Sequence, residues 1–497
     1  MEAYCGAGMV EPVSRRKVAE PAKKLPRFST SVALSEVISK GVRFEAAAFD
    51  LEGRQAIQAM RGSGLQLEPL YGNSALADFA STPLRSSRVY VDPDHGVGFL
   101  SSSDIISMRP EIENYVSRKL TAKLDEMLVQ EWDILISRSG TVGNVALASR
   151  RLAGLALSEH AIRLRARRIA DAGLICSFLR SRFGRLQLIG ASYGSVVQHI
   201  EPEHLARVLI PSFAASVREL ISAKMMRAAK ERDKANSLID DADSALHETL
   251  RLEPLGQESI HSSGPAVSKL RLRALASRFE ASYHNPRVSE AELRIKRIGC
   301  EIVALNDKRL TREIRPITKF RKRVYVSSGG IPMLSSKQLM QIDPVDVKRL
   351  AKGAHTKNLS EIALEHNMVT ISRSGTIGRI QIIPAYMEGW AGSEHATRIV
   401  AADKMNPGFL YAWLASDYGQ KLIKRHAYGS VILEIDKEMI GSMPIPLPQR
   451  KFCDRIGDFV LRANELRDTA WQLERESIKE LEQLIESRVS RRPLRSA

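Results

Sequence analysis

Two stretches of the chain repeat apolar residues at alternating spacings of four and three, the pattern of a helix with one narrow apolar seam. Each stretch covers about 35 residues, which as a helix is about 50 Å long. Such a narrow seam needs a partner, so we expect the two helices to pair as an antiparallel coiled coil. The seam positions are Ile221, Met225, Ala228, Ala235, Ile239, Ala242 and Leu246, interrupted by Arg232, and then Ile456, Phe459, Ala463, Leu466, Ala470 and Leu473.

The sequence before each predicted helix mixes short strand patterns with helical ones. Runs such as "WDILISRSG" and "HNMVTISRSG" are strand-like and end at glycine. Patches such as "GLICSFLRSRFGRLQL" and "GFLYAWLASDYGQKLI" place apolar residues at helical spacing. Each mixed part then ends in a proline-bearing strand, "RVLIPS" or "SMPIPLP". The pattern predicts an α+β fold in which two globular heads are each followed by a long helix.

The two halves of the chain are copies of one unit. "ISRSGTVG" starts at Ile136 and "ISRSGTIG" at Ile371, an offset in numbering of 371 − 136 = 235, and "RFEA", "SEHA" and "YGSV" recur at the same offset. Over residues 136–200 and 371–435, 24 of 65 positions are identical. A period this long indicates two domain-sized copies rather than a solenoid. We divide the chain into a basic tail (1–27), a first head (28–212), a first helix with linker (213–262), a second head (263–447), and a second helix with C-terminal tail (448–497).

Charge points to a polyanionic partner. Lys plus Arg is 74 and Asp plus Glu is 57, a net charge of +17, for which nucleic acid is the commonest partner. The four cysteines are widely separated and form no CxxC pair, so neither a disulfide framework nor a zinc cluster is expected, and a reducing cytoplasm fits. No apolar run approaches the eighteen or so residues of a membrane span.

The order and repetition of these motifs resemble the specificity (S) subunit of type I restriction–modification systems. The resemblance rests on "RFEA", "SRSGTVG", "YGSVVQHI" followed by "LIP", and the helix after it, and covers almost the whole chain after residue 28. It implies that each head is a target recognition domain that reads one half of a split site in double-stranded DNA. It also implies that the helices set the gap and hold two DNA methyltransferase (M) subunits, and that restriction/translocase (R) subunits join the complex.

The same resemblance implies that this chain carries no cofactor and no catalysis, since S-adenosylmethionine, ATP and Mg²⁺ belong to the partner subunits. The sequence agrees, because it contains neither a P-loop nor an NPPY-like methyltransferase motif. The competing interpretations are a stand-alone enzyme and an RNA-binding architectural protein. A low aromatic content of 6% weakens the single-stranded RNA case.

The candidate DNA contacts come from two sources. Segments 54–130 and 289–365 diverge more than their flanks, and their basic residues suit phosphates and base edges. The octapeptide adds an arginine and a serine in each copy, although a tight turn kept for packing is the stronger interpretation there. The candidates are Arg85, Arg88, Arg118, Lys119, Arg138 and Ser139 in the first copy, and Arg321, Lys322, Arg323, Lys357, Arg373 and Ser374 in the second.

"SEHA" suggests a Ser–His–acid site at first sight, but no oxyanion motif accompanies it. On a predicted strand, Glu159 and His160 would point to opposite faces. Buried hydrogen bonding is therefore the expected role of this motif.

Overall fold

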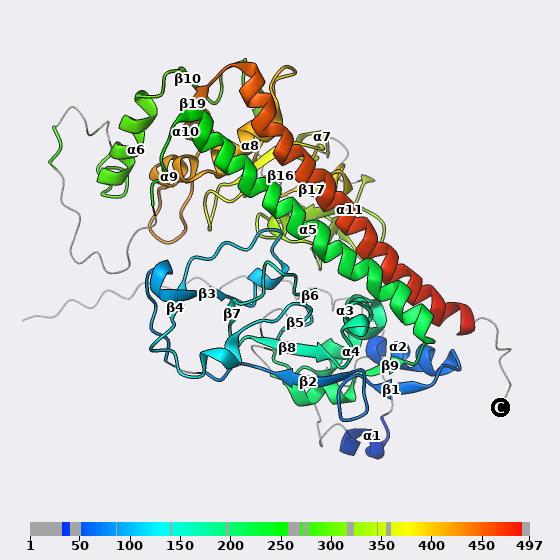
Figure 1. Ribbon diagram of the computed structural model, residues 1–497. Coiled ribbons are helices and arrows are strands. Elements are labelled where there is room, and N and C mark those ends of the chain that lie inside the picture. The colour runs from blue at the N-terminus through cyan, green and yellow to red at the C-terminus, as the bar shows by residue number, and fades with distance from the viewer. Residues whose placement is uncertain are drawn as a thin grey trace, which may run out of the picture.

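The computed structural model shows an α+β protein in which two β-rich heads lie against one pair of long helices (Figure 1). It describes residues 32–39, 51–85, 87–139, 142–194, 198–256, 269–271, 275, 278–315, 323–344, 346–353 and 359–489. No helix within these ranges is long and apolar enough to cross a membrane.

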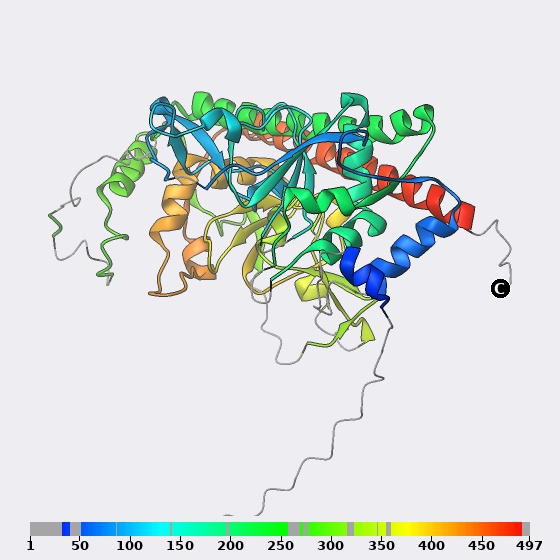
Figure 2. The same ribbon diagram turned by 90° about the horizontal axis from the view of Figure 1, so that it is seen from below.

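The long helices are α5 (Ala215–Leu250) and α11 (Arg450–Val489), which lie side by side in both views (Figures 1 and 2). They run antiparallel, since Lys224 near the start of α5 pairs with Glu480, whereas Glu248 near its end lies 3.5 Å from Arg455. The predicted pairing of the two helices is therefore confirmed.

The first head is built on a four-stranded antiparallel sheet with the order β2-β8-β5-β6, next to a smaller sheet of order β4-β3-β7. Strand β5 runs into the first two residues of the octapeptide, and all four of its residues are buried. Strand β1 pairs with the proline-bearing strand β9 and closes the head just before α5. Its elements are α1 (Leu34–Ser39), α2 (Leu51–Gly62), β1 (Leu67–Pro69), β2 (Ala77–Ser81), η2 (Pro93–His95), β3 (Gly96–Leu100), η3 (Asp104–Ile106), β4 (Tyr115–Ser117), η4 (Leu124–Met127), β5 (Ile134–Ser137), β6 (Val145–Leu147), β7 (Ala156–Leu157), β8 (Ala161–Ala166), η5 (Ile169–Asp171), α3 (Ala172–Arg180), α4 (Arg182–Ala191), η6 (Pro202–Arg207) and β9 (Leu209–Pro211).

The second head repeats this plan. Its main sheet has the order β11-β18-β15-β16, its smaller sheet the order β12-β14-β13-β17, and β10 pairs with β19 just before α11. Both main sheets carry a register shift at the same place, in β2 and in β11. Its elements are α6 (Pro286–Lys296), β10 (Glu301–Ala304), β11 (Thr311–Arg315), β12 (Tyr325–Val326), β13 (Ile331–Leu334), η8 (Gln338–Met340), β14 (Lys348–Leu350), α7 (Leu359–Ile362), β15 (Val369–Ser372), β16 (Ile380–Ile382), η10 (Ala385–Met387), β17 (Ala391–Gly392), β18 (Ala396–Ala401), α8 (Pro407–Ala415), α9 (Asp417–Arg425), α10 (Lys437–Gly441) and β19 (Pro444–Leu447).

Each head docks on its own long helix through a glycine. A Cβ atom at Gly173 of α3 would lie 2.3 Å from the backbone oxygen of Ser222, and one at Gly408 of α8 would lie 2.2 Å from that of Gly457. Only glycine allows α3 to approach α5, and α8 to approach α11, this closely. The two glycines are separated by the same offset as the two octapeptides, so the same docking is made twice.

The hydrophobic cores show that each long helix serves both heads. The first core takes Met225 from the start of α5 and Leu481 from the end of α11. The second core takes Ile239 and Leu246 from the end of α5 and Ile456 from the start of α11. Each head is thus completed by two helix segments that are far apart in sequence.

The predicted seam positions are not equally buried. Ile221, Met225, Ile239, Leu246 and Ile456 are at most 4% exposed. Phe459, Leu466 and Leu473 are only half-buried, whereas their neighbours Val460, Arg467 and Glu474 are buried. At these three positions of α11 the buried residue is therefore the next one along the chain, whereas Ala463 and Ala470 are buried as predicted. Two of the three buried residues, Arg467 and Glu474, are charged, so the apolar pattern did not count them. Arg232, which interrupts the seam of α5, pairs with Glu474.

Candidate nucleic-acid interface

The "SEHA" motif forms an exposed turn in each head, between β7 and β8 and between β17 and β18. The expectation that Glu159 and His160 lie on a strand is wrong, since both belong to this turn. Glu159 points inward and pairs with Arg88, whose guanidinium also lies 4.6 Å above the ring of Phe99. The His160 side chain is 53% exposed, so it is not the buried hydrogen-bonding group that the motif suggested.

The octapeptide of the first head lies directly beside this turn. The backbone N–H of Arg138 donates to the carbonyl of His160, at 2.8 Å. Its guanidinium Nε lies 3.0 Å from Glu201 Oε2. The Ser139 Oγ lies 2.7 Å from His160 Nδ1. Arg88 is thereby brought to the same turn as Arg138 and Ser139, which lie about fifty residues further along the chain.

Glu201 is the acid that holds the first octapeptide. Its carboxylate binds Arg138 and also accepts a hydrogen bond from the Tyr193 hydroxyl, at 2.6 Å. Burial opposes ionisation of Glu201, but the hydrogen bonds from Arg138 and Tyr193 outweigh it and lower its pKa. The same hydrogen bond, which Arg138 donates to Glu201, raises the pKa of Arg138. Tyr193 opens the repeated "YGSV" motif, which therefore supports the octapeptide rather than only turning the chain.

The second head builds the same turn. Arg323 pairs with Glu394, and the backbone N–H of Arg373 donates to the carbonyl of His395 at 2.8 Å. The acid at the position of Glu201 is Asp436, and it accepts a hydrogen bond from Tyr428 at 2.7 Å. Here the guanidinium of Arg373 lies 3.7 Å from Glu434 and 3.8 Å from Asp436.

Positive charge gathers around the turn of the first head. Burial and then the nearby charges of Arg138, Arg88 and Arg85 lower the pKa of His160, so the imidazole is neutral at pH 7. Arg85 is exposed, whereas Arg88 and Arg138 are partly buried by their carboxylate partners. An anion that approached the turn would meet three arginines and an imidazole on one small surface, a suitable setting for a phosphate.

The remaining candidates lie elsewhere or outside the described residues. Arg118 and Lys119 are exposed just after β4, where the N–H of Arg118 donates to the carbonyl of His95. Arg321, Lys322 and Lys357 fall outside the described residues. Ser374 lies beside Arg373, and its Oγ is 3.5 Å from Glu434.

Sequence reasoning missed three further residues at this surface. Val431, Ile432 and Leu433 form the tip of the hairpin that joins Tyr428 to Glu434, and their exposed fractions are 93%, 61% and 45%. Their only signal in the sequence was an apolar run directly after the glycine and serine of "YGSV".

The described residues contain no group of three or more His, Cys, Asp or Glu side chains that could hold a metal ion. The described polar clusters at the two turns are ion pairs and hydrogen bonds at equivalent positions. Arginine side chains at such turns are suited to binding an anionic surface.

Residues 313–480 match the family described as "Type I restriction modification DNA specificity domain". No curated protein sequence matches the chain.

Three solved structures are similar to the chain. The S subunit of a type I restriction–modification system from M. genitalium has 13% identity and a TM-score of 0.35, over 85% of this chain and 95% of that one. The HsdS subunit from Thermoanaerobacter tengcongensis has 16% identity and a TM-score of 0.27, over 84% and 98%. A chain from a study of complex assembly and conformational transition in the type I R-M system has 16% identity and a TM-score of 0.28, over 82% and 94%.

Proposed function

Since the chain belongs to the specificity subunits of type I restriction–modification systems, we propose that its two heads read the two unlike halves of one split DNA site. A specificity subunit recognises the DNA target and carries out no catalysis itself. The family match covers residues 313–480, and the first half of the chain repeats that domain in sequence and in sheet order. This repetition supports one recognition unit in each head.

The observation that supports the proposal is the arginine-bearing turn that each head builds at the same place. Arg88, Arg138 and Ser139 meet at residues 158–160 of the first head. Arg323, Arg373 and Ser374 occupy the equivalent positions in the second head. These arginines are shared by both heads, so they suit the phosphate backbone, which carries no sequence information. Sequence is then read by residues that differ between the heads, such as Arg118 and Lys119.

The partners that fit this role are double-stranded DNA, two M subunits and R subunits. The outer faces of α5 and α11 remain for the M subunits. S-adenosylmethionine, ATP and Mg²⁺ act on the M and R subunits, since specificity subunits carry no cofactor. We expect the purified chain, supplied with DNA, S-adenosylmethionine, ATP and Mg²⁺, neither to methylate nor to cut.

The test is to map methylation by single-molecule sequencing in cells that express the chain with the methyltransferase that co-purifies with it. The expected motif has two unlike halves separated by a constant number of unread base pairs. One continuous palindrome, or no motif at all, would contradict the proposal.

Point variants separate the two kinds of contact. Replacing Arg321 and Arg323 by Ala should weaken binding, and should relax the second half-site if either residue contacts a base. If both contact only phosphate, affinity should fall evenly across sequences and the dependence on salt should become shallower. Arg450→Ala, on an exposed arginine at the start of α11, is the matched control and should leave the site unchanged.

A further inference from the structure

The two heads contact one another directly, apart from their shared helices. Residues 106–108 of the first head pair with residues 340–342 of the second in a short antiparallel bridge centred on Ser107 and Gln341. The N–H of Met108 donates to the carbonyl of Met340 and the N–H of Ile342 donates to the carbonyl of Ile106, both at 2.8 Å. We call residues 106–108 and 340–342 the head bridge.

The head bridge is formed by equivalent segments of the two copies. "LSSSDIISMRP" starts at Leu100 and "LSSKQLMQIDP" starts at Leu334, an offset in numbering of 334 − 100 = 234. At this offset Ser107 corresponds to Gln341, so the central pair joins a residue to its own counterpart. The same correspondence maps each of the two hydrogen bonds onto the other. The bridge therefore lies on the pseudo-twofold axis that relates the heads.

The chain that leads into each bridging segment has the same local structure. Each follows a one-turn 3-10 helix, η3 or η8, whose first residue caps the preceding turn. Asp104 accepts a hydrogen bond from the N–H of Ser101 at 3.0 Å, and Gln338 accepts one from the N–H of Ser335 at 3.0 Å. The same local device thus holds each bridging segment in its extended form.

Met108 anchors the bridge in the second head and in α5. Its side chain is 6% exposed and belongs to a hydrophobic cluster of the second head that includes Leu334 and Leu339. Its carbonyl accepts a hydrogen bond from the buried side-chain amide of Asn236 on α5, at 3.1 Å. A residue of the first head is therefore part of the packing of the second.

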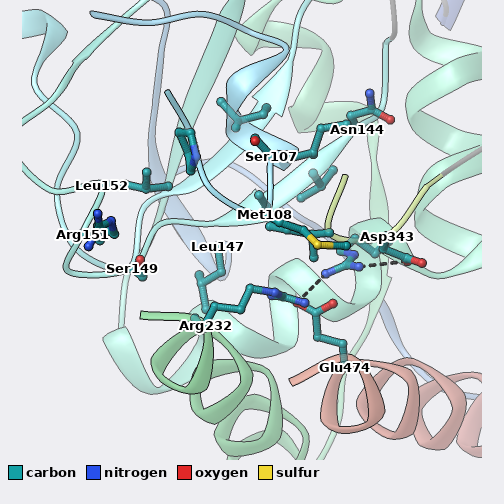
Figure 3. Close-up of a pocket in the computed structure, with 18 of the residues that line it drawn as sticks. Ser107, Met108, Asn144, Leu147, Ser149, Arg151, Leu152, Arg232, Asp343 and Glu474 are labelled. Carbon is teal, nitrogen blue, oxygen red and sulfur yellow. Dashed lines mark hydrogen bonds and ion pairs between the residues drawn. The ribbon is translucent and has the colours of Figure 1, made fainter. Parts of the chain in front are cut away.

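A buried ion cluster lies next to the bridge (Figure 3). Arg180 of the first head lies 3.0 Å from Asp343 of the second head and 2.9 Å from Glu474 of α11. Glu474 also pairs with Arg232 of α5, and Asp343 pairs with Arg475. Burial opposes ionisation of Glu474, but the charges of Arg180 and Arg232 dominate and lower its pKa to about 2. The cluster joins both heads and both long helices at one point.

We propose that the head bridge fixes the distance and the rotational phase of the two heads, so that it sets the gap of the DNA site together with the helices. This proposal rests on the proposed function. A head held only by its packing on the long helices could still tilt or shift against them. A second attachment, on the symmetry axis and away from the helix connection, removes that freedom. A gap that is longer or shorter by one base pair would then require the bridge to break.

The sharpest test locks the bridge covalently. Ser107 and Gln341 are a non-hydrogen-bonded antiparallel pair, whose Cα atoms are about 4.5 Å apart in such ladders, within the range that a disulfide accepts. The full chain carries Ser107→Cys and Gln341→Cys, with Cys5 and Cys300 replaced by Ser. Each single cysteine variant serves as a control. Oxidation should give one intramolecular cross-link, seen as a mobility change on a non-reducing gel.

Binding of the complex with M subunits is then measured on DNA whose two half-sites are separated by the native gap or by one base pair more or less. The cross-linked protein should bind the native gap as tightly as the reduced protein does. A cross-link that abolishes binding until it is reduced, or that does not form in the native protein, would overturn the proposal.

A second variant weakens the bridge instead. Ile342→Pro removes the N–H that donates to Ile106, and Gln341 already has the extended backbone (φ −89, ψ 145) that a residue before proline requires. Ile342→Ala shortens the side chain but keeps that N–H and is the matched control. One lost hydrogen bond should reduce the discrimination against the wrong gap by about threefold to tenfold. Equal discrimination in the proline and alanine variants would also overturn the proposal.

The failure of this proposal is distinguishable from the failure of the proposed function. If the unmodified complex recognises no split site, the proposed function fails. If it recognises one split site with a fixed gap, but the locked protein cannot bind it or the proline variant keeps full discrimination, only the role of the head bridge fails.

Discussion

The arginine of the repeated octapeptide is held differently in the two heads. In the first head, Arg138 makes a direct hydrogen bond of 3.0 Å to Glu201. In the second head, Arg373 lies 3.8 Å from Asp436, which occupies the position of Glu201 but has one methylene group fewer. The tyrosines at the equivalent positions bind both acids at nearly the same distance, 2.6 Å and 2.7 Å. The shorter acid stays with its tyrosine and does not reach the arginine.

The same octapeptide can therefore hold its arginine more tightly in one copy than in the other. Before Arg138 can contact a phosphate, it must give up a charge-assisted hydrogen bond, which contributes about 1 kcal/mol at this partly exposed site. Arg373 has no direct hydrogen bond to a carboxylate: it gives up a longer hydrogen bond to the Ile435 carbonyl, at 3.3 Å, and the attraction of Glu434 and Asp436. The second head is therefore the one in which the octapeptide arginine is more available to DNA.

The largest effect expected from the comparison of the heads is a change of the half-site itself. Exchanging residues 54–130 for the equivalent segment of a relative should change the first half-site only, and exchanging 289–365 should change the second only. In both exchanges the native residues 100–110 and 334–344 are kept, because they contain the head bridge. Methylation mapping measures the result. A change in both half-sites after one exchange would contradict the proposal that each head reads one half-site.

The next largest effect concerns the cores that the two helices complete. Ile239→Asp places an unpaired charge in the core of the second head, although Ile239 follows the first head in sequence. It should cost several kcal/mol, about 3–5 kcal/mol, in the free energy of unfolding. Leu481→Asp should do the same to the first head.

Hydrogen exchange resolved by peptide measures where protection is lost in these two variants. Ile239→Asp should expose second-head peptides first, and Leu481→Asp should expose first-head peptides first. Ser237→Asp, at an exposed position of α5, is the control and should change little. The same pattern of hydrogen exchange in both core variants would contradict the conclusion that each head's core depends on a different segment of the two long helices.

A smaller effect should distinguish the heads by pH. His247 at the end of α5 lies 3.4 Å from Asp417 of the second head, and this hydrogen bond, despite burial, raises the pKa of His247 to about 9. The pair therefore stabilises the fold fully below about pH 6.5, and the stabilisation is lost as the pH rises through 9. At the equivalent positions of the first head, Glu482 accepts a hydrogen bond from the backbone N–H of Arg182, and no histidine is present.

We expect the attachment of α5 to the second head to weaken by about 1–2 kcal/mol between pH 6.5 and 9, less than the full pKa shift would give because solvent screens the pair. Hydrogen exchange of second-head peptides at several pH values, corrected for the intrinsic rate, measures it. His247→Gln should remove the dependence. A pH dependence of equal size in first-head peptides would show that another group is responsible.

The smallest effect concerns the octapeptide arginines, Arg138 and Arg373. Asp436→Glu should let the acid reach Arg373 and make the second head resemble the first, and Glu201→Asp should do the reverse. One charge-assisted contact is worth about 1 kcal/mol here, so affinity for DNA should fall or rise by about fivefold. The salt dependence of binding should change in the same direction as affinity. If both swaps leave affinity and salt dependence unchanged, the octapeptide arginines do not contact DNA.

The sequence predicted the repeated parts of this structure well. The constant offset between the copies, the apolar runs before the octapeptide and the two helix seams were sufficient for two α+β heads on an antiparallel helix pair. The spacing of apolar residues indicates which positions are buried, and this spacing is similar in the two copies. The seam of α11 was only partly predicted, because Arg467 and Glu474 are buried there as charged residues and an apolar pattern cannot count them.

The contacts within each site were less predictable. "SEHA" and "YGSV" marked the right places, but the partners of Glu159 and Tyr193 are 71 and 8 residues away in sequence. The head bridge was hidden for a different reason. Its two segments correspond at an offset that is smaller by one than the offset of the octapeptides, so an ungapped comparison of the copies places them out of register. They also fall inside the divergent segments, which were interpreted as DNA-reading throughout.

The exchange of helix segments between the cores has a consequence for how the protein is made. The first head is synthesised early, but Ile478, Leu481 and Ile485, which complete its core, lie in the last helix, beyond the whole of the second head. At typical rates of synthesis the ribosome needs roughly ten to fifty seconds to supply them. During that interval the apolar surface that later receives α11 is exposed. We therefore expect the first head to depend on chaperones until the last helix arrives, and to be the part of the nascent protein most open to aggregation and proteolysis.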